Sequence, residues 1–278
     1  MDVPETKPSS IPMVSVCIPV FNGEKYLQEA LDSVLQQSYS DFEVIVRDDV
    51  STDRSWDVLE SIRDPRVKVF RNKENLGAEQ NWNRVVGESR GQYVKLFHQD
   101  DLLESGCLER QVAALDAHPQ CSMVFSGRSI IRGDGKIIVQ IRSPWKMGLV
   151  SRHQVIRSCV SSGTNRVGEP SVVLFRKDVF VDAGGFDGTV PYTIDLDLWD
   201  RLLKLGPGFS IPDTLVRFRV SPGQWSMRIG KEQGSQFREW VDRLESKGFA
   251  LSFWNRTRAR LLSRIHVRLR RMFAVLMG

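Results

Sequence analysis

Two pairs of adjacent carboxylates are the residues in this sequence best placed to do chemistry. Asp100 and Asp101 end the apolar run that begins at Tyr93, and Asp48 and Asp49 end a similar run. Adjacent carboxylates repel each other, so such a pair usually has a cation beside it. A hard divalent ion such as Mg2+ takes oxygen ligands and often bridges one or two carboxylates to substrate phosphates. Taken alone, either pair also fits a solvated loop or a helix N-terminus, where Asp is favoured.

A third candidate is the carboxylate of Asp195, in a segment with helical periodicity. Asp197 has Arg201 four residues further on, which is the spacing of an ordinary surface ion pair on a helix. Asp195 has Trp199 at that position instead, so its pKa can suit a base. Because residues two apart on a helix do not share a face, only one of the two aspartates can point into a site, and we favour Asp195.

The elements that must position these groups follow from the hydrophobic periodicity. Strands are expected at 14–20, 42–46, 67–70, 93–97, 122–125, 171–175 and 214–220, with helices near 24–37, 52–62, 79–89, 103–117 and 195–203. Alternating strands and helices predict an α/β fold with a mostly parallel sheet covered by helices on both faces. Ligands bind outside the carboxyl ends of the strands in such sheets. The polar clusters at 19–22, 48–49 and 100–101 should therefore open onto one edge.

Composition predicts one globular domain with appendages. The chain has 278 residues, 41% of them hydrophobic, and no apolar run long enough for a membrane span. We predict a flexible leader at 1–12, the main domain at 13–230 and a helical, basic tail at 231–278. The four cysteines are widely spaced, and the N-terminus has no hydrophobic block. Reduced cysteines and a cytoplasmic location fit this pattern.

The positive charge is concentrated in the tail. Residues 256–278 include seven arginines and no acid or lysine. The whole chain has a net charge of +5, so the remaining residues together are slightly negative. A nucleic-acid partner is therefore not expected. The apolar stripe of the tail consists of Leu261, Ile265, Leu269, Met272 and Leu276. A basic amphipathic helix of this kind predicts binding to an anionic membrane surface, here the inner face. The alternative is a helix packed on the domain or on a second subunit.

Several motifs, in order, resemble those of the inverting family 2 glycosyltransferases, which have the GT-A fold. The matching segments are Val16–Asn22, Val46–Asp53, Asn75–Gly77 with Asn83, Gln99–Asp101, Gly184–Phe186 and Asp195–Trp199. They extend over roughly residues 14–226. The resemblance implies transfer of a sugar from a nucleotide-diphosphate sugar to a glycan or lipid-linked acceptor, with a divalent cation, Mg2+ or Mn2+, as cofactor.

The resemblance also implies residue roles. Asp195 is expected to act as the catalytic base, and Asp101 is expected to bind the metal. Trp145 and Trp199 are expected to stack on the acceptor. The residues expected to bind the donor are Pro19, Phe21, Asn22, Asp49, Asn83 and Asp100. Asp49 is expected to hydrogen-bond the donor base, because Asp53 can cap the next helix and leave Asp49 free. For Trp199, the alternative to stacking on a sugar is a position in the hydrophobic core.

Two departures from the family pattern keep other functions open. Ile194 stands where the family usually has Glu before the base, and Ser221 stands where many members have a metal-binding His. These two residues motivate the alternative of a catalytically silent nucleotide-sugar-binding scaffold in polysaccharide assembly. A dinucleotide-dependent oxidoreductase needs a G-x-G-x-x-G loop after the first strand, and that loop offers only Gly23.

Overall fold

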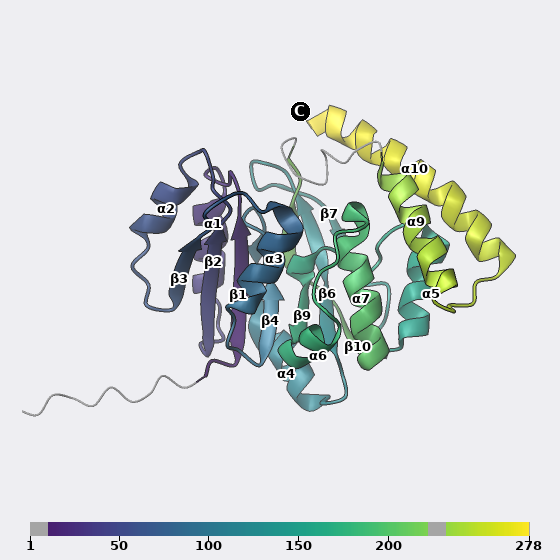
Figure 1. The fold of residues 1–278 in the computed structure, drawn as a ribbon, viewed down its shortest axis with the longest axis horizontal. Helices are drawn as coiled ribbons and strands as arrows, with labels where there is room; N and C mark the ends of the chain where they lie inside the picture. The colour runs from purple at the N-terminus through teal and green to yellow at the C-terminus, as the bar shows by residue number, and fades with distance from the viewer. Residues whose placement is uncertain (1–10, 222–231, 278) are drawn as a thin grey trace, which may run out of the picture.

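The computed structural model describes residues 11–221 and 232–277, with side chains of the last helix described as far as His266. The described strands form one ten-stranded sheet (Figure 1). They are β1 (Val14–Val20), β2 (Phe42–Asp48), β3 (Val67–Arg71), β4 (Tyr93–Leu96), β5 (Leu102–Leu103), β6 (Met123–Ile131), β7 (Ile137–Ile141), β8 (Gly148–Val150), β9 (Val173–Arg176) and β10 (Gly208–Arg219).

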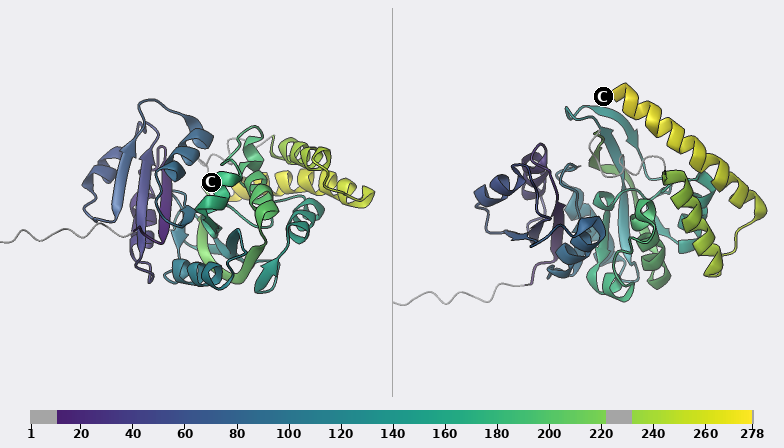
Figure 2. Two further views of the ribbon diagram at one scale, coloured as in Figure 1. Left: turned by 60° about the horizontal axis from the view of Figure 1, so that its bottom comes forward. Right: turned by 45° about the horizontal axis from the view of Figure 1, so that its top comes forward.

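Helices lie on both sides of this sheet, as the sequence predicts (Figures 1 and 2). They are α1 (Leu27–Leu35), α2 (Ser55–Ser61), α3 (Gly77–Gly87), α4 (Cys107–Ala117), α5 (Arg152–Ser162), α6 (Lys177–Asp182), α7 (Ile194–Leu205), α9 (Gln233–Ser246) and α10 (Phe253–Met277), with two 3-10 turns, η1 (Pro170–Val172) and η2 (Pro191–Thr193). Every residue of β1 and β2 is buried, so both strands are largely apolar. The charged side chains that β2 also buries all form ion pairs, and they are Glu43, Arg47 and Asp48.

The strand order creates a switch point between β1 and β4. The order is β3-β2-β1-β4-β9-β6-β10-β5, so the chain first builds outward from β1 in one direction and then in the other. β1 pairs in parallel with both β2 and β4, and β6 pairs in parallel with β10. β9 is antiparallel to both of its neighbours. The sheet is therefore mixed and mostly parallel, and its switch point is the expected place for a ligand.

The elements predicted from the sequence are present, with differences at some of their boundaries. The last strand begins at Gly208 rather than at 214, and α5 and α6 occupy stretches where the sequence shows no clear period. Bulges in the pairing of β10 with β6 lie between Ile211 and Val216, around Pro212, which cannot donate to the ladder.

The C-terminal part of the chain consists of α9 and α10, which pack on each other and, through α10, on α5 (Figure 2). Within the described residues, no helix combines the length and apolar character needed to cross a bilayer. The predicted leader lies almost entirely outside the described residues. The predicted boundary at residue 230 also falls in the undescribed segment, so this division remains a prediction.

Candidate active site

The switch point is closed by a paired contact between the loops that follow β1 and β4. The Phe21 amide donates to Gln99 Oε1 over 2.9 Å, and Gln99 Nε2 donates back to the Phe21 carbonyl over 3.0 Å. Phe21 itself is 40% exposed. The predicted convergence of these two loops at one sheet edge is therefore confirmed, and an exposed aromatic ring lies where they meet.

Pro19 differs from the expectation that it belongs to this loop. It is the sixth residue of β1, it is buried, and it lies opposite Arg47 of β2. The loop begins at Phe21, so Phe21 and Asn22 are the exposed candidates for contact with a donor. The Cys17 carbonyl accepts from the Phe97 amide on the β4 side, so Pro19, two residues later, faces that side as well. The pairing of β1 with β4 ends at Cys17 and Leu96, so the missing N–H of Pro19 costs no ladder bond.

The loops after β1 and β2 hold each other in unusual backbone conformations. Asn22 and Val50 have φ angles of 51° and 60°, and residues other than glycine rarely adopt positive φ angles. The Asn22 amide donates to Ser51 Oγ over 2.9 Å, and Asn22 Oδ1 accepts from the Thr52 amide over 2.8 Å. Strain of this kind persists only where surrounding contacts enforce it, and it is concentrated at functional sites.

Asp49 is held inside the protein rather than left free, so this part of the expectation is wrong. Its carboxylate accepts hydrogen bonds from Asn72 Nδ2 and from the backbone amides of Leu76 and Gly77, all between 2.7 and 2.9 Å. Asp53 does bond the Ser55 amide at the start of α2, as predicted, but Asp49 serves the start of α3 in the same way. A contact of Asp49 with a donor base stays a prediction.

Asn83 hydrogen-bonds α3 to the turn Gly184–Phe186, which follows α6. Its Oδ1 accepts from the Phe186 amide over 2.8 Å, and its Nδ2 donates to the Phe186 carbonyl over 2.9 Å. The pair of bonds gives Asn83 a clear positioning role for the segment Gly184–Phe186. Its predicted direct contact with a donor stays a prediction.

The two members of the acidic pair differ sharply in environment. Asp101 is 0% exposed, and its carboxylate accepts from Ser171 Oγ over 2.6 Å and from the Arg219 amide over 3.0 Å. Burial, reinforced by the charge of Asp100, raises the pKa of Asp101 well above its usual value. Asp100 is half-buried, so it is the more accessible member of the pair.

Arg219, which the sequence reading did not single out as a site residue, holds the pair in place. Its side chain is almost fully buried, and its Nε donates to the Asp100 carbonyl over 2.8 Å. Its Nη2 lies 2.7 Å from the carboxylate of Glu29 on α1, and its guanidinium lies 4.3 Å from the centre of the Tyr26 ring. The end of β10 therefore braces the acidic loop against α1.

Asp195 lies in the first turn of α7, in a half-buried position. Its Oδ1 accepts from the Leu196 amide over 2.7 Å, and its Oδ2 accepts from Asn165 Nδ2 over 3.0 Å. Burial raises the pKa of Asp195 to about 7, with the nearby charge of Glu169 contributing in the same direction. Asp197 instead forms the predicted ion pair with Arg201 over 2.7 Å. The geometry thus separates the two aspartates as the sequence suggests.

The segment 163–172, a loop that ends in η1, contacts both Asp195 and Asp101, and no motif in the sequence marks it. Asn165 bonds Asp195, Ser171 bonds Asp101, and Ser171 Oγ also accepts from the His98 amide over 3.1 Å. Glu169, in the same loop, lies 2.6 Å from Arg128 Nε and acts electrostatically on Asp195 and Asp101. This supporting loop is therefore the structural link between the base candidate and the acidic pair.

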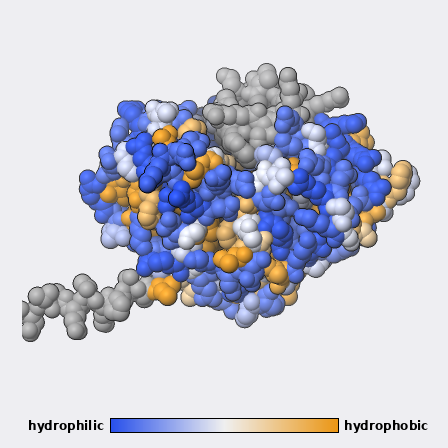
Figure 3. All heavy atoms as spheres, in the orientation of Figure 1, coloured by the Kyte–Doolittle hydropathy of each residue, from blue (hydrophilic) through white to orange (hydrophobic). Residues whose placement is uncertain are grey.

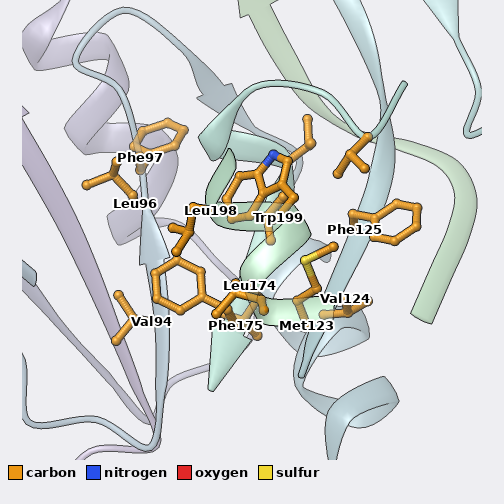
Figure 4. Close-up of a cluster of buried hydrophobic side chains, with 14 of the residues drawn as sticks. Val94, Leu96, Phe97, Met123, Val124, Phe125, Leu174, Phe175, Leu198 and Trp199 are labelled. Carbon is orange, nitrogen blue, oxygen red and sulfur yellow. The ribbon is translucent and has the colours of Figure 1, made fainter. Parts of the chain in front are cut away.

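Trp199 is a core residue, so its predicted acceptor contact is wrong. It is 0% exposed, and Figure 4 shows its ring among Leu198, Phe125 and Met123. Its indole N–H donates to the Gly168 carbonyl over 3.3 Å. A fully buried ring cannot stack on a sugar, but this one supports the loop that holds Asp195.

Trp145 packs close to the end of β6 that adjoins β9. Its ring packs edge-on against Phe125 at 5.4 Å, and its carbonyl accepts from Ser210 Oγ over 3.3 Å. Phe125 lies opposite Val173 of β9, and the neighbouring Ser171 bonds Asp101. The expected acceptor contact of Trp145 stays a prediction.

Replacing Trp199 by alanine is expected to destabilise the protein by about 3–5 kcal/mol, because it removes a large buried side chain and leaves a cavity. Urea unfolding followed by circular dichroism measures the change. Trp199→Phe is the matched control, since it keeps most of the volume and removes the bond to Gly168, and it should cost clearly less. An unchanged urea midpoint for Trp199→Ala would contradict the buried position.

The acidic pair fits a divalent cation that is shared with a substrate. Among the described residues, no three or more His, Cys, Asp and Glu side chains are grouped as a complete metal site. Mg2+, however, usually keeps few protein ligands and completes its coordination with waters and substrate phosphates. A partly exposed Asp100 beside a buried Asp101 provides oxygen ligands of that kind.

Comparison with known proteins gives the family. Residues 15–181 match the model described as "Glycosyl transferase family 2". An uncharacterized protein of Mycobacterium tuberculosis is 30% identical over 230 residues, covering 78% of this chain and 70% of that protein. The putative teichuronic acid biosynthesis glycosyltransferase TuaG of Bacillus subtilis is 34% identical over 126 residues, covering 45% of this chain and 50% of TuaG.

Solved structures share the fold. TarS 1–349 of S. aureus in complex with UDP-GlcNAc superposes with a TM-score of 0.69 at 19% identity, covering 92% of this chain and 72% of that one. The mannosyltransferase PcManGT of Pyrobaculum calidifontis, in complex with GDP-Man and Mn2+, gives a TM-score of 0.62 at 17% identity, covering 98% and 76%. The sheet is thus the GT-A fold, and the chain belongs to glycosyl transferase family 2, as a glycosyltransferase.

Proposed function

We propose that this glycosyltransferase is an inverting, divalent-cation-dependent enzyme. It moves a sugar from a nucleotide-diphosphate sugar to a hydroxyl of a glycan or a lipid-linked acceptor, in the synthesis of a surface polysaccharide or glycolipid. The relative described as a putative teichuronic acid biosynthesis glycosyltransferase supports the acceptor class. The neighbours crystallised with UDP-GlcNAc and with GDP-Man support the donor class.

The observation that carries the proposal is the environment of Asp195. An acceptor hydroxyl has too high a pKa to attack unaided, so a base must take its proton as the new bond forms. A pKa of about 7 leaves Asp195 able to accept that proton near neutral pH. The bonds from Asn165 and Leu196 fix the orientation of the carboxylate. Attack from the face opposite the leaving diphosphate inverts the anomeric centre.

The donor is expected to lie over the switch point, with Phe21 and Asn22 beside its nucleoside and Asp100 near its diphosphate. Asp100 is the better candidate ligand for the cation because Asp101 is buried and bonded to Ser171 and Arg219. Asp101 then positions the loop through these two hydrogen bonds. When bound, the cation would neutralise the charge that develops on the leaving diphosphate.

A lipid-linked acceptor places the enzyme at a membrane surface. The tail from Arg256 to Gly278 carries seven arginines and no acid, which favours an anionic leaflet electrostatically. We propose a peripheral location on the inner face of the membrane, where the tail keeps the enzyme near its acceptor.

A thermal-shift panel of nucleotide sugars with Mg2+ or Mn2+ tests the donor assignment. At about 100 times the dissociation constant, a ligand adds about 2.7 kcal/mol of stability. For a chain of this size that corresponds to a Tm increase of roughly 5–10 °C. We expect such a shift with one nucleotide class, larger with the cation than with a chelator present.

The control is the free sugar of each donor, which lacks the nucleotide and should produce no shift. Absence of a shift with every nucleotide sugar, with either cation, would overturn the proposal. Binding without turnover across a broad acceptor panel would instead support the silent scaffold. Ile194 and Ser221 motivate that alternative, and the Ile194 side chain is buried in the core.

A further inference from the structure

The last helix, α10, is amphipathic, and in its described part several large apolar side chains point away from the protein. The side chains that it buries most deeply against the body are small, Ala259 and Ser263, and Leu262 and His266 lie half-buried beside them. The large apolar side chains Trp254, Leu261 and Ile265 are 74%, 58% and 39% exposed. A helix that packs only on its own domain presents its large apolar residues inward. The arrangement in α10 therefore indicates a partner on the outer side.

The contact with α5 fixes the rotation of α10, so the outward face is not accidental. Gly163, which ends α5 in a left-handed conformation with a φ of 69°, lies so close that a Cβ there would approach Ser263 N to 2.6 Å. The His266 ring nitrogen lies 3.0 Å from the Ser162 carbonyl. The missing side chain of Gly163 allows this close approach, and the contact determines which face of α10 remains outside.

The outward residues form one stripe. Trp254, Arg258, Leu261 and Ile265 follow each other at intervals of four, three and four, which places them on one side of a helix. Phe253, which precedes the stripe, is 70% exposed and packs edge-on against Trp254 with ring centres 5.9 Å apart. Figure 3 shows apolar atoms at the right-hand edge of the molecule, where α10 begins in Figure 1.

Charge identifies the partner. The segment from Phe253 to Met277 contains no acidic residue, and Arg258, Arg260 and Arg264 are exposed beside the stripe. Arg256 is the exception, because it pairs with Glu245 of α9. Aromatic and aliphatic side chains flanked by arginine match the boundary between headgroups and acyl chains of an anionic bilayer.

We infer that the outward face of α10, formed by Phe253, Trp254, Leu261 and Ile265 with Arg258, Arg260 and Arg264, lies in the surface of an anionic lipid bilayer. Helix α10 leads toward the side of the molecule where the carboxyl ends of the parallel strands lie (Figure 1). Bound in this way, the protein holds its candidate site near the membrane. Lipid binding itself does not depend on the proposed transferase function, whereas use of a lipid-linked acceptor does.

The test is co-sedimentation of the full chain with vesicles of phosphatidylcholine containing about one third phosphatidylglycerol, against vesicles of phosphatidylcholine alone. We expect binding to the anionic vesicles only, weakened by salt. The variant Trp254→Ser/Leu261→Ser/Ile265→Ser should bind at least about tenfold more weakly. Its matched control is Met147→Ser/Val181→Ser/Leu205→Ser, which removes three comparably exposed apolar side chains elsewhere and should bind like the wild type.

Three results would overturn the inference. They are absence of binding to anionic vesicles, equal binding by the stripe variant and the wild type, and equal loss in the control variant. If the stripe variant changed the oligomeric state in light scattering without changing vesicle binding, the face would be a protein interface instead. The thermal shift with nucleotide sugars should be the same in all variants. Failure of that shift in the wild type would contradict the transferase proposal and leave the lipid result intact.

Discussion

Replacing Asp195 by asparagine is expected to lower kcat by about 10²–10⁴-fold, the usual contribution of a general base. Donor affinity should change little, because the amide keeps the shape of the carboxylate and the site for the nucleotide lies at the β1–β4 switch point. Turnover assays together with donor binding by calorimetry measure both quantities. Asp197→Asn is the matched control on the same helix, and it loses only an ordinary ion pair with Arg201.

The same substitution has an expected effect on stability with a definite sign. The pKa of Asp195 is raised to about 7 in the folded protein, so the folded state binds more protons than the unfolded state between about pH 4 and pH 7. The contribution of this group to stability therefore falls as the pH rises through that window. Asp195→Asn should raise Tm at pH 8 relative to the wild type, and it should do so less at pH 5.

The pH dependence of turnover gives the outcome that would contradict this assignment. The wild type should gain activity as the pH rises through about 7, because the base must be ionised. Asn165→Ala removes a hydrogen bond that favours the ionised form, so it should move this rise to higher pH. Full turnover by Asp195→Asn, or an unchanged pH profile in Asn165→Ala, would show that the base lies elsewhere.

Substitutions of Asp100 and Asp101 are expected to have different effects, because we assign cation binding to Asp100 and structural support of the loop to Asp101. Asp100→Asn should lower kcat/KM by about 10²-fold or more, by weakening electrostatic stabilisation of the leaving diphosphate. It should also remove most of the additional thermal shift that Mn2+ gives to a nucleotide sugar. The fold should be unaffected, because the Arg219 bond reaches the Asp100 backbone carbonyl and not its side chain.

Asp101→Asn should instead act mainly on stability. Ser171 Oγ and the Arg219 amide donate to different oxygens of the carboxylate, and the amide replaces one of these oxygens with an NH2 group, so one buried donor loses its acceptor. Such a loss costs about 1–3 kcal/mol. A fully stable Asp101→Asn variant that has lost its response to Mn2+ would reverse our assignment and make Asp101 the cation ligand, as the family resemblance implies.

The sheet and its functional edge could be predicted because their signals are local. Fully buried strands such as β1 read as continuous apolar runs, and the polar residues after them mark the carboxyl edge. The direction of β9 could not be read in this way, since a four-residue buried strand looks the same in either orientation. The prediction of a mostly parallel sheet was therefore correct in general, but it missed the antiparallel pairing of β9 and of the strands β5, β7 and β8.

The support of the site could not be predicted because its contacts join distant parts of the chain. Asn165 and Asp195 are 30 residues apart, and Ser171 and Asp101 are 70 apart. Neither Asn165 nor Ser171 belongs to a local pattern that distinguishes it from an ordinary loop residue. Asp49 was misjudged for a related reason, since the amides that it binds belong to a helix that begins 28 residues later.

One short segment joins α10, whose outward face we infer to bind lipid, to Asp195, the proposed base. Gly163 touches α10, and Asn165, two residues further on, bonds Asp195. Thermodynamic reciprocity then applies: any factor by which a bilayer changes the affinity for the nucleotide sugar is also the factor by which the nucleotide sugar changes the affinity for the bilayer. Vesicle binding measured with and without donor thus reports the coupling between the two sites without any assay of turnover.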